Sequence, residues 1–491
     1  MPRGITIVGL GPGAPGSLTI EAHQVLTSVS QVHVRTLKHP TISALPPAIQ
    51  VHSFDDAYER GETFREVYAH IARQVIELGL RDEGVIYAVP GHPLVGEASV
   101  RLILELAREE GLAVRIVDGL SFLEPICTIL RLDPLDGLQI EDAMTLAEAH
   151  HPAVDPDKPL LVGQVCSRDI AADLKLSLMM AYPDDHPVTL VQAAGTASGM
   201  ARTIPLHDLD RDSDIDHLTS LYVPPLAQPG ALSTFQTVVA RLRAPGGCPW
   251  DQEQTHASLR PFLLQETHEV LEALDRDDAD ALQEELGDLL LQILLHTQIA
   301  TEDQEFTMSD VVGHIVAKLK RRHPHVFGQL QVTGAQDVLT NWERIKTEEK
   351  RAARQAAGGE AGLHSALNGL PPTLPALARA QALAERAARV GLEWSGMEQL
   401  AAQAQAEWEK LRSSIGNPHQ EIQLGEFLFT LTNLSRWLGV DAESSLRAAA
   451  ARFERRFADL EALLAEQGSS LQEMDSSQWR DLWEQSAKTS S

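Results

Sequence analysis

The sequence predicts a multidomain chain in which an α/β region precedes an all-helical region that contains two related units. Before residue 224, short apolar runs that end in small-residue turns alternate with helical patterns, which is typical of α/β structure. After residue 232, apolar residues recur at helical spacing. At about 150 residues per domain, 491 residues correspond to roughly three domains.

The first predicted strand spans residues 5–10 and ends in the glycine turn GLGPG, which a helical pattern at 18–30 follows. A strand, a glycine turn and a helix in this order begin an α/β unit. Further strands are predicted at 32–35, 84–89, 113–117, 160–165 and 189–192, with helical patterns at 62–79 and 98–110 between several of them.

Small-residue loops follow three of these strands: GLGPG at 9–13, VPGHPLVG at 89–96 and GLS at 119–121. Loops at the carboxyl ends of strands form the ligand crevice of α/β folds. GLGPG lacks the last glycine of the dinucleotide-binding fingerprint GxGxxG. GLGPG therefore either contacts a ligand other than a dinucleotide or serves only to form a tight turn.

Over residues 1–224, GLGPG, RTLKHP at 35–40, YAVPGHPLVGE and GLSFLEPI together resemble the tetrapyrrole methylase family. The resemblance implies two α/β lobes that bind S-adenosylmethionine between them and methylate a tetrapyrrole. It implies cofactor contacts by Gly9, Gly11, Gly13, Gly91, His92, Pro93 and Ser121. Ala14 and His92 stand where catalytically established members have acidic residues, so cofactor binding is expected more than methyl transfer. His92 is either a general base or a structural histidine.

The helical region begins with two predicted helices at 264–295, joined by a short acidic turn. Each helix carries two carboxylates three residues apart, and a spacing of three places both on one helix face. The pairs are Glu266 with Glu269, and Glu285 with Asp288. Four carboxylates are therefore predicted to converge.

Both pairs border apolar stripes. On the second helix the stripe consists of Leu282, Leu286, Leu289 and Ile293, and its helical spacing predicts that it faces a core. Carboxylates beside a buried seam repel one another and lose water unless a cation neutralises them. Oxygen ligands favour Mg²⁺ or Mn²⁺ over zinc. The alternative is a solvated acidic face, which is common in a chain with 69 acidic residues.

Further motifs flank these helices: GGCPWD at 246–251, KLKRRHPHVF at 318–327 and NWERIK at 341–346. The cations of the second motif suit either phosphate binding or a solvated helix C-terminus. In this order, CPWD, ETHEV, EELGDLL, KLKRRHPHVF and NWERIK resemble the MazG family of nucleoside triphosphate pyrophosphohydrolases over residues 232–349.

The MazG resemblance implies hydrolysis of a nucleoside triphosphate to a monophosphate and pyrophosphate by an all-helical unit. It implies that Glu266, Glu269, Glu285 and Asp288 are the catalytic residues and Mg²⁺ ligands, that Lys318, Arg321, Arg322 and Lys346 contact phosphate, and that Trp250 stacks on the base. Gln265 stands where many members have a further glutamate. The two resemblances together match the YabN-type bifunctional fusions.

The helical region repeats itself, since QLGEFLFTLTNL at 423–434 resembles ELGDLLLQILLH, and RFERRFADLE at 452–461 resembles KLKRRHPHVF. The alignment places Glu407, Lys410, Gln423 and Glu426 at the four carboxylate positions, so the second unit is not expected to bind metal. The predicted domains are 1–224, a linker at 225–231, a catalytic unit at 232–350, a linker at 351–375, a degenerate unit at 376–470 and a polar tail at 471–491.

Composition narrows the partners and the compartment. A formal net charge of −28 argues against nucleic acid as the main partner. Three scattered cysteines form neither a disulfide framework nor a zinc motif. No signal peptide and no apolar run of about 18 residues is found, which predicts a cytoplasmic protein without membrane contact. The family resemblance and the helical apolar faces suggest a homodimer.

Two rival functions stay open. In the first, the methylase-like region is the active partner, with S-adenosylmethionine and a tetrapyrrole as ligands, and the helical half supports it. In the second, the chain is a nucleotide- or cofactor-sensing scaffold without turnover, consistent with Ala14, His92 and Gln265. The four carboxylates favour hydrolysis over the second reading.

Overall fold

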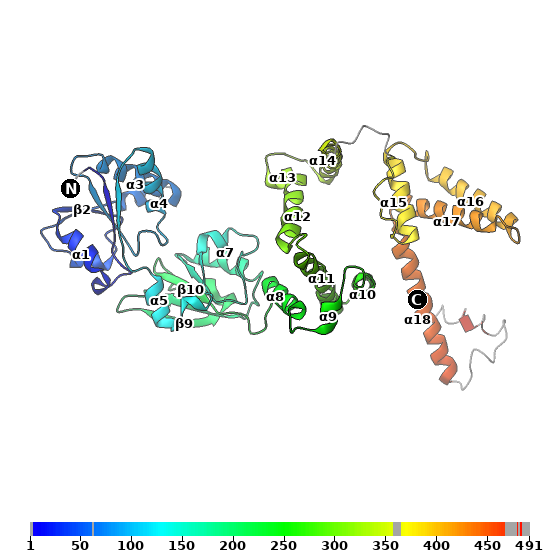
Figure 1. The fold of residues 1–491 in the computed structure, drawn as a ribbon, viewed down its shortest axis with the longest axis horizontal. Coiled ribbons are helices and arrows are strands. Elements are labelled where there is room, and N and C mark those ends of the chain that lie inside the picture. The colour runs from blue at the N-terminus through cyan, green and yellow to red at the C-terminus, as the bar shows by residue number, and fades with distance from the viewer. Residues whose placement is uncertain (1–2, 61–62, 357–364, 467–478, 480–481, 484–491) are drawn as a thin grey trace. The chain divides into compact units, whose positions relative to one another are not determined.

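The computed structural model describes residues 3–60, 63–356, 365–466, 479 and 482–483. The chain divides into two compact units, Met1–Gln254 and Thr255–Ser491. All strands of the described residues lie in the first unit, and the second is helical (Figure 1). Within the described residues, no helix combines the length and the apolar character needed to cross a membrane.

The first lobe of the first unit is built on a parallel sheet with the strand order β3-β2-β4-β1-β5. Its strands are β1 (Ile5–Gly9), β2 (Gln31–Val34), β3 (Gln50–Ser53), β4 (Val85–Val89) and β5 (Val114–Val117), and its helices are α1 (Ile20–Thr27), α2 (Asp55–Arg60), α3 (Phe64–Gly79) and α4 (Ala98–Glu109). The α/β assignment of this region is confirmed.

Both faces of this sheet are buried. Ile5 and Ile7 of β1 pack in one hydrophobic cluster with residues of α3 and α4. Val8 and Leu10 pack in a second cluster with residues of α1. Because successive residues of a strand point to opposite faces, a strand covered on both sides reads as a continuous apolar run. This explains why β1 and β4 were evident from the sequence.

The second lobe has a mixed sheet with the order β6-β7-β10-β8-β9, in which only β6 and β7 are parallel. Its elements are α5 (Leu123–Leu130), β6 (Gln139–Asp142), α6 (Ala143–Ala147), β7 (Leu160–Gly163), α7 (Arg168–Leu178), β8 (Pro187–Gln192), β9 (Met200–Pro205) and β10 (Thr219–Val223). Leu160, Leu174, Leu190 and Leu221 form part of its core.

Four strands were not predicted. β3, β6 and β9 are edge strands with polar sequences, QVHS, QIED and MARTIP, and they lack the buried run that marks a central strand. β10 is central and buried, yet its five residues follow a polar segment and do not stand out as an apolar run. Pairing with neighbouring strands, which the sequence does not show, decides these elements.

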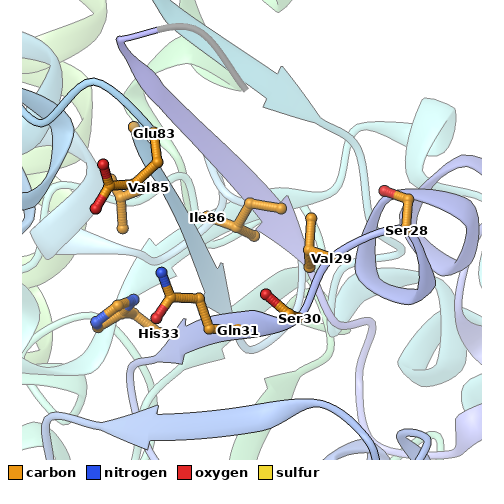
Figure 2. A pocket seen from close by; sticks show the side chains of 9 residues that line it. Ser28, Val29, Ser30, Gln31, His33, Glu83, Val85 and Ile86 are labelled. Atoms are coloured by element: carbon orange, nitrogen blue, oxygen red, sulfur yellow. The ribbon is translucent and has the colours of Figure 1, made fainter.

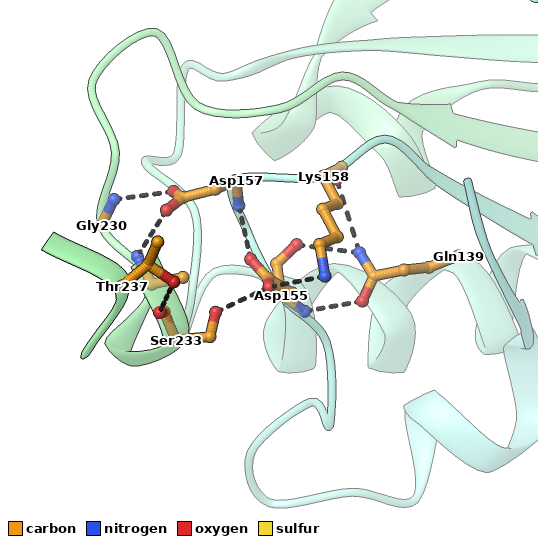
Figure 3. A network of polar contacts seen from close by, with 8 residues as sticks. Gln139, Asp155, Asp157, Lys158, Gly230, Ser233 and Thr237 are labelled. Atoms are coloured by element: carbon orange, nitrogen blue, oxygen red, sulfur yellow. Dashed lines mark hydrogen bonds and ion pairs between the residues drawn. The ribbon is translucent and has the colours of Figure 1, made fainter. Parts of the chain in front are cut away.

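The proline- and glycine-rich segment at 225–231 is fixed on the second lobe (Figure 3). The Asp157 carboxylate accepts hydrogen bonds from the backbone N–H groups of Gly230, at 2.7 Å, and Ala231, at 3.0 Å. The Ser233 hydroxyl donates to Asp155 at 2.8 Å. These contacts hold the start of α8 (Leu232–Arg243). The first compact unit consequently extends through α9 (Pro249–Glu253) to Gln254, beyond the boundary predicted near residue 224.

The second unit consists of helices only, within the described residues. They are α10 (Arg260–Arg276), α11 (Ala279–Glu302), α12 (Met308–Arg322), α13 (Pro324–Phe327), α14 (Ala335–Ala356), α15 (Ala376–Arg389), α16 (Met397–Ser414), α17 (Gln420–Trp437) and α18 (Ala442–Glu466). The predicted acidic turn joins α10 to α11. Asp277 adopts a left-handed conformation at the end of α10, and the Asp278 carboxylate caps α11 by accepting from Ala281 N–H.

The apolar stripe predicted on α11 is only partly covered by the described residues, since Leu282 and Leu289 are half-buried. Leu286 and Ile293 are 48% and 42% exposed. The adjacent face of α11, which includes Gln292 and Ile299, is buried instead. The prediction of a buried stripe was therefore wrong for Leu286 and Ile293. A helical period identifies an apolar face but does not say what covers it.

Candidate metal centre and ligand crevice

Three of the four predicted carboxylates meet at one point of the helical unit. Oxygen atoms of Glu266 on α10 and of Glu285 and Asp288 on α11 all lie within 4.8 Å of one another. The spacing of three residues places Glu285 and Asp288 on one face of α11, and the α10–α11 hairpin brings Glu266 opposite them. The donor set contains oxygen only, which suits a hard divalent cation.

Glu269 lies beside this cluster. Its side chain is hydrogen-bonded to Glu266 and accepts a hydrogen bond from the Gln265 amide at 3.2 Å. Gln265, which replaces a further glutamate of the family pattern, thus orients Glu269 without adding a charge. Of the pair on α10, only Glu266 belongs to the close cluster.

Negative charge accumulates in the cluster. Partial burial raises the pKa of Glu266, and the contact with Glu269 and the charges of Asp288 and Glu285 add to this. Partial burial and the neighbouring carboxylates, Glu269 first among them, likewise raise the pKa of Glu285. Raised carboxyl pKa values mark sites that gain from a cation. The residues present therefore fit a divalent metal.

The predicted phosphate-binding arginines are held by a carboxylate that sequence reasoning did not identify. Glu349 on α14 accepts hydrogen bonds from Arg321 Nε at 2.6 Å and from Arg322 at 2.6 and 3.0 Å. The hydrogen bond from Arg322 is the main cause that lowers the pKa of Glu349 to about 2. The sequence does not indicate that Glu349 pairs with these arginines, because the pairing depends on the contact between α12 and α14.

An indole extends this cationic cluster. Lys346 Nζ lies 4.5 Å from the centre of the Trp342 ring, and the Arg322 guanidinium lies 5.3 Å from it. Stacking on an aromatic face holds cations in place. Lys318 is half-buried on α12. Trp250 lies on α9 in the first unit and is 52% exposed, so base stacking by Trp250 stays a prediction.

The second helical unit neutralises the corresponding position by itself. Glu407, at the position of Glu266, is 6% exposed and accepts a hydrogen bond from Lys410 at 2.9 Å. Gln403 donates to the same oxygen at 2.6 Å. Lys410 stands where the first of the two helical units, predicted at 232–350, has Glu269. An internal lysine thus supplies the positive charge that a metal would supply beside Glu266.

The three glycine loops of the first lobe converge. β1 pairs in parallel with β4 and β5, so the three strands end at one edge of the sheet. Gly91 N–H donates to Gly11 O at 2.8 Å, and Gly11 N–H donates to Gly91 O at 3.3 Å. A Cβ atom on Gly9 would lie 2.6 Å from Gly91 O and 2.7 Å from Gly119 N. The predicted convergence is present, and Gly9 serves close backbone packing.

The RTLKHP motif and the residue after it hold the first glycine loop. His39 Nε2 lies 3.0 Å from Gly11 O. The Thr41 hydroxyl contacts Leu10 O at 3.3 Å and Gly13 O at 3.1 Å. Arg35, at the start of the motif, pairs with the buried Glu97 at 2.7 Å. The sequence indicated the motif but not this anchoring role.

The remaining predicted cofactor contacts are engaged locally. His92 Nδ1 accepts a hydrogen bond from Leu94 N–H at 3.1 Å, and its Nε2 lies 3.4 Å from Asp118 Oδ1. The Ser121 hydroxyl is 3% exposed and donates to Glu124 at 2.7 Å. Pro93 is buried. These contacts favour the structural interpretation of His92, and Ser121 supports the start of α5.

The two lobes meet at the glycine loop. Ala14 N–H donates to Gly195 O at 3.1 Å, and the Gln164 amide donates to Gly96 O at 2.7 Å. The loops predicted to bind a cofactor thus border the second lobe. A cavity of about 260 Å³ between Ser28 and Ile86 lies instead at the amino ends of β2 and β4 (Figure 2). Ligand sites of parallel sheets form at the carboxyl ends, so this cavity is not the crevice.

Comparisons with known proteins also divide the chain into a methylase-like part and a MazG-like part. Residues 4–209 match the tetrapyrrole (corrin/porphyrin) methylases, and residues 254–327 match the MazG nucleotide pyrophosphohydrolase domain. The uncharacterized protein YabN of Bacillus subtilis is 38% identical over 499 residues, which cover 99% of this chain and 98% of YabN. The nucleoside triphosphate pyrophosphohydrolase of Escherichia coli K12 is 40% identical over 255 residues, 51% of this chain and 94% of that protein.

Among solved structures, a uroporphyrin-III C-methyltransferase of Thermus thermophilus covers 45% of this chain and is covered over 94% of its own length. Its identity is 21% and its TM-score is 0.36, too low to carry a functional conclusion. The fold and the two matches define a class of two-part protein, a methylase-like α/β unit joined to a helical hydrolase unit. The chain belongs to the YabN-type family of tetrapyrrole methylase and MazG fusions.

Proposed function

We propose that the helical unit hydrolyses nucleoside triphosphates, or their deoxy forms, to the monophosphate and pyrophosphate, and that it depends on Mg²⁺ or Mn²⁺. The observation that carries this proposal is the convergence of Glu266, Glu285 and Asp288 from two helices. The MazG match and the pyrophosphohydrolase relatives support it.

The proposed roles follow from the contacts. Glu266, Glu285 and Asp288 would hold the metal, which, when bound, supplies charge neutralisation for the triphosphate and lowers the pKa of water. Glu269, adjacent to the cluster and oriented by Gln265, accepts the proton of the attacking water. Water attacks the α-phosphorus and pyrophosphate leaves.

The cationic cluster on α12 and α14 suits the departing pyrophosphate. Arg321 and Arg322 already bind a carboxylate in a geometry that phosphate oxygens also accept. Substrate phosphates would replace the oxygens of Glu349 as their partners. Lys346, held over Trp342, and Lys318 add positive charge. The negative charge that develops on the leaving group is stabilised by these groups.

The test is pyrophosphate release from a panel of ribo- and deoxyribonucleoside triphosphates, with Mg²⁺ and with chelator. We expect monophosphate and pyrophosphate in equal amounts with metal and none with chelator. Release of single phosphate, or metal-independent turnover by folded protein, would contradict the proposal. The same panel ranks the bases and the sugars.

Metal binding is also expected to change thermal stability in a pH-dependent way. At neutral pH, Mg²⁺ at about 100 times its Kd should raise the unfolding temperature of the helical unit by about 5–10 °C. The pKa values of Glu266 and Glu285 lie above the usual 4.5, so the metal-free fold gains stability from their protonated forms below pH 4.5 and loses it as pH rises through the raised values. Mg²⁺ binds the ionised forms, so its effect should vanish in acid.

Differential scanning fluorimetry measures this effect, and Asp288→Asn is the diagnostic variant. It should be slightly more stable than the wild-type chain in chelator, because it removes one repelling charge from the cluster. The increase in unfolding temperature that Mg²⁺ causes in the wild-type chain should also be lost in this variant. An unchanged Mg²⁺ response in this variant would remove Asp288 from the metal site.

Methyl transfer from S-adenosylmethionine to a tetrapyrrole is the second candidate function. The observation that favours it is the convergence of the glycine loops at the carboxyl edge of β1 and β4, next to the second lobe. Calorimetry with S-adenosylmethionine tests it. Saturable binding would support a cofactor site, and its absence in folded protein would leave the α/β unit without this ligand.

We also propose that the helical unit forms a homodimer. Leu286 and Ile293 on α11 and Val311, Ile315 and Leu319 on α12 are exposed. The last three recur every four residues and form one apolar face of α12. Packing against a second copy would remove these faces from water. Light scattering measures the molecular mass in solution, and a mass of two chains would support the homodimer. The cytoplasm stays the proposed compartment.

A further inference from the structure

A row of polar side chains continues from the exposed Asp288 along α11, through the buried Gln292 to the half-buried His296. Gln292 and His296 follow Asp288 at intervals of four residues, which places all three on one face of the helix. Gln292 is 5% exposed, and its Oε1 atom has no hydrogen-bond partner among the described residues. His296 Nε2 is likewise buried without one. Buried polar atoms without partners are unfavourable in a folded chain, so a ligand that bonded to both atoms would gain affinity from them.

His296 is held in a fixed orientation by a second histidine. Its Nδ1 atom lies 2.7 Å from His256 Nδ1, and the two rings are nearly parallel, at 4°. One Nδ1 must donate and the other accept, which requires at least one neutral ring. Burial, and then the charge of His256, lowers the pKa of His296. Nε2 of a neutral His296 remains for one further hydrogen bond.

The position of the row relates it to the metal centre. At 1.5 Å per residue, Gln292 and His296 lie about 6 Å and 12 Å beyond Asp288 along the helix axis. When the triphosphate of a nucleotide binds at the carboxylates, its nucleoside extends away from them in one direction. A nucleoside that extends along α11 would meet Gln292 first and His296 second.

The degenerate unit supplies an internal comparison. With Glu426 at the position of Asp288, the alignment places Thr430 at Gln292 and Leu434 at His296. The Thr430 hydroxyl donates to Glu426 O within its own helix at 2.9 Å, so it needs no ligand. The row is therefore absent from the copy in which two of the four carboxylates are replaced. The buried atoms of α17 without a partner among the described residues belong instead to Gln423 and Asn433, outside the two row positions. The loss of the row together with two carboxylates supports a shared role for the two features.

We propose that Gln292 and His296 bind the nucleoside part of the substrate. Gln292 Oε1 accepts a hydrogen bond from a sugar hydroxyl or a base amine, and His296 Nε2 makes a second bond to the same nucleoside. This inference rests on the proposed hydrolase function and adds the residues that set its preference among nucleotides. A site that binds a polar group rejects substrates that lack it, because the buried partner is then left unpaired.

The test compares nucleotides with a ligand that has phosphates but no nucleoside. We expect Gln292→Leu to raise KM for the preferred triphosphate roughly 10- to 100-fold, with little change in kcat. Inhibition by inorganic tripolyphosphate should stay within about twofold of the wild-type value, because only nucleoside binding is removed. The spread of KM across bases or across sugars should narrow. Whichever spread narrows identifies the group that Gln292 binds.

Two further variants keep the result interpretable. Gln298→Leu makes the same substitution on α11 outside the row, where Gln298 contacts Glu302, and should leave KM unchanged. His296→Phe should act in the same direction as Gln292→Leu. A parallel change in nucleotide KM and tripolyphosphate inhibition would overturn the inference, as would no change in either. So would a change in molecular mass by light scattering, since it would assign the row to a subunit interface.

Equilibrium dialysis with labelled nucleoside triphosphate separates this inference from the proposed function. If the wild-type chain bound nucleotide without releasing pyrophosphate, hydrolysis would be wrong. A weaker affinity of Gln292→Leu in that experiment would still support the nucleoside row, and an unchanged affinity would refute it.

Discussion

Replacement of Glu285 by glutamine is expected to lower pyrophosphate release roughly 10³-fold while leaving the helical fold intact. Glu285 contributes one of three carboxylates that lie within 4.8 Å of one another. A bound divalent ion is worth several kcal/mol of charge stabilisation in the transition state, and each 1.4 kcal/mol is about tenfold in rate. The amide keeps the shape of the side chain but removes its charge. The measurement is kcat with saturating Mg²⁺ and nucleotide.

Glu284→Gln is the matched control for this experiment. Glu284 is the preceding residue of the same helix, is exposed and stands outside the cluster. It should retain kcat within about twofold, because exposed charges contribute little. Wild-type kcat in Glu285→Gln would refute the metal centre. An equal loss in both variants would show that charge on α11, and not the cluster, is responsible.

Replacement of Gly9 by alanine is expected to destabilise the first unit by more than about 3 kcal/mol. The added Cβ would lie 2.6 Å from Gly91 O, 2.7 Å from Gly119 N and 2.8 Å from Gly119 Cα. All three are backbone atoms, which cannot rotate away as a flexible side chain can. β1 and the loops that follow β4 and β5 would have to move apart at the point where the loops converge.

Scanning calorimetry and limited proteolysis of the full chain measure this effect. Gly16→Ala is the control, because a Cβ at Gly16 meets nothing within 4 Å. We expect early cleavage within the first unit for Gly9→Ala and wild-type behaviour for Gly16→Ala. An unfolding temperature of Gly9→Ala within about 2 °C of wild type would show that the loops can move apart.

Local patterns predicted most of the elements that position the sites. The apolar runs of β1 and β4 were visible because both faces of each strand are buried. The carboxylate pairs were visible because a helix brings residues three apart onto one face. The repeat aligned Lys410 with Glu269, and the structure shows that Lys410 pairs with Glu407, a contact that the alignment did not predict.

Contacts between distant segments could not be predicted in the same way. Glu349 binds Arg321 and Arg322 only because α14 packs on α12. Asp157 fixes the segment before α8 through two backbone N–H groups, a contact that proline and glycine content does not reveal. The partnerless atoms of Gln292 and His296 became visible only once burial was known.

The sequence by itself determined the α/β and helical halves and the family, because both rest on local periodicity or on motif order. The role of the four acidic positions and the degenerate character of the second helical unit stay predictions from the same patterns. The tertiary structure alone decided which carboxylates come together, how the glycine loops pack, what holds the arginines and which polar atoms are buried. These features depend on packing between residues far apart in the chain, and periodicity within one element carries no information about its partner.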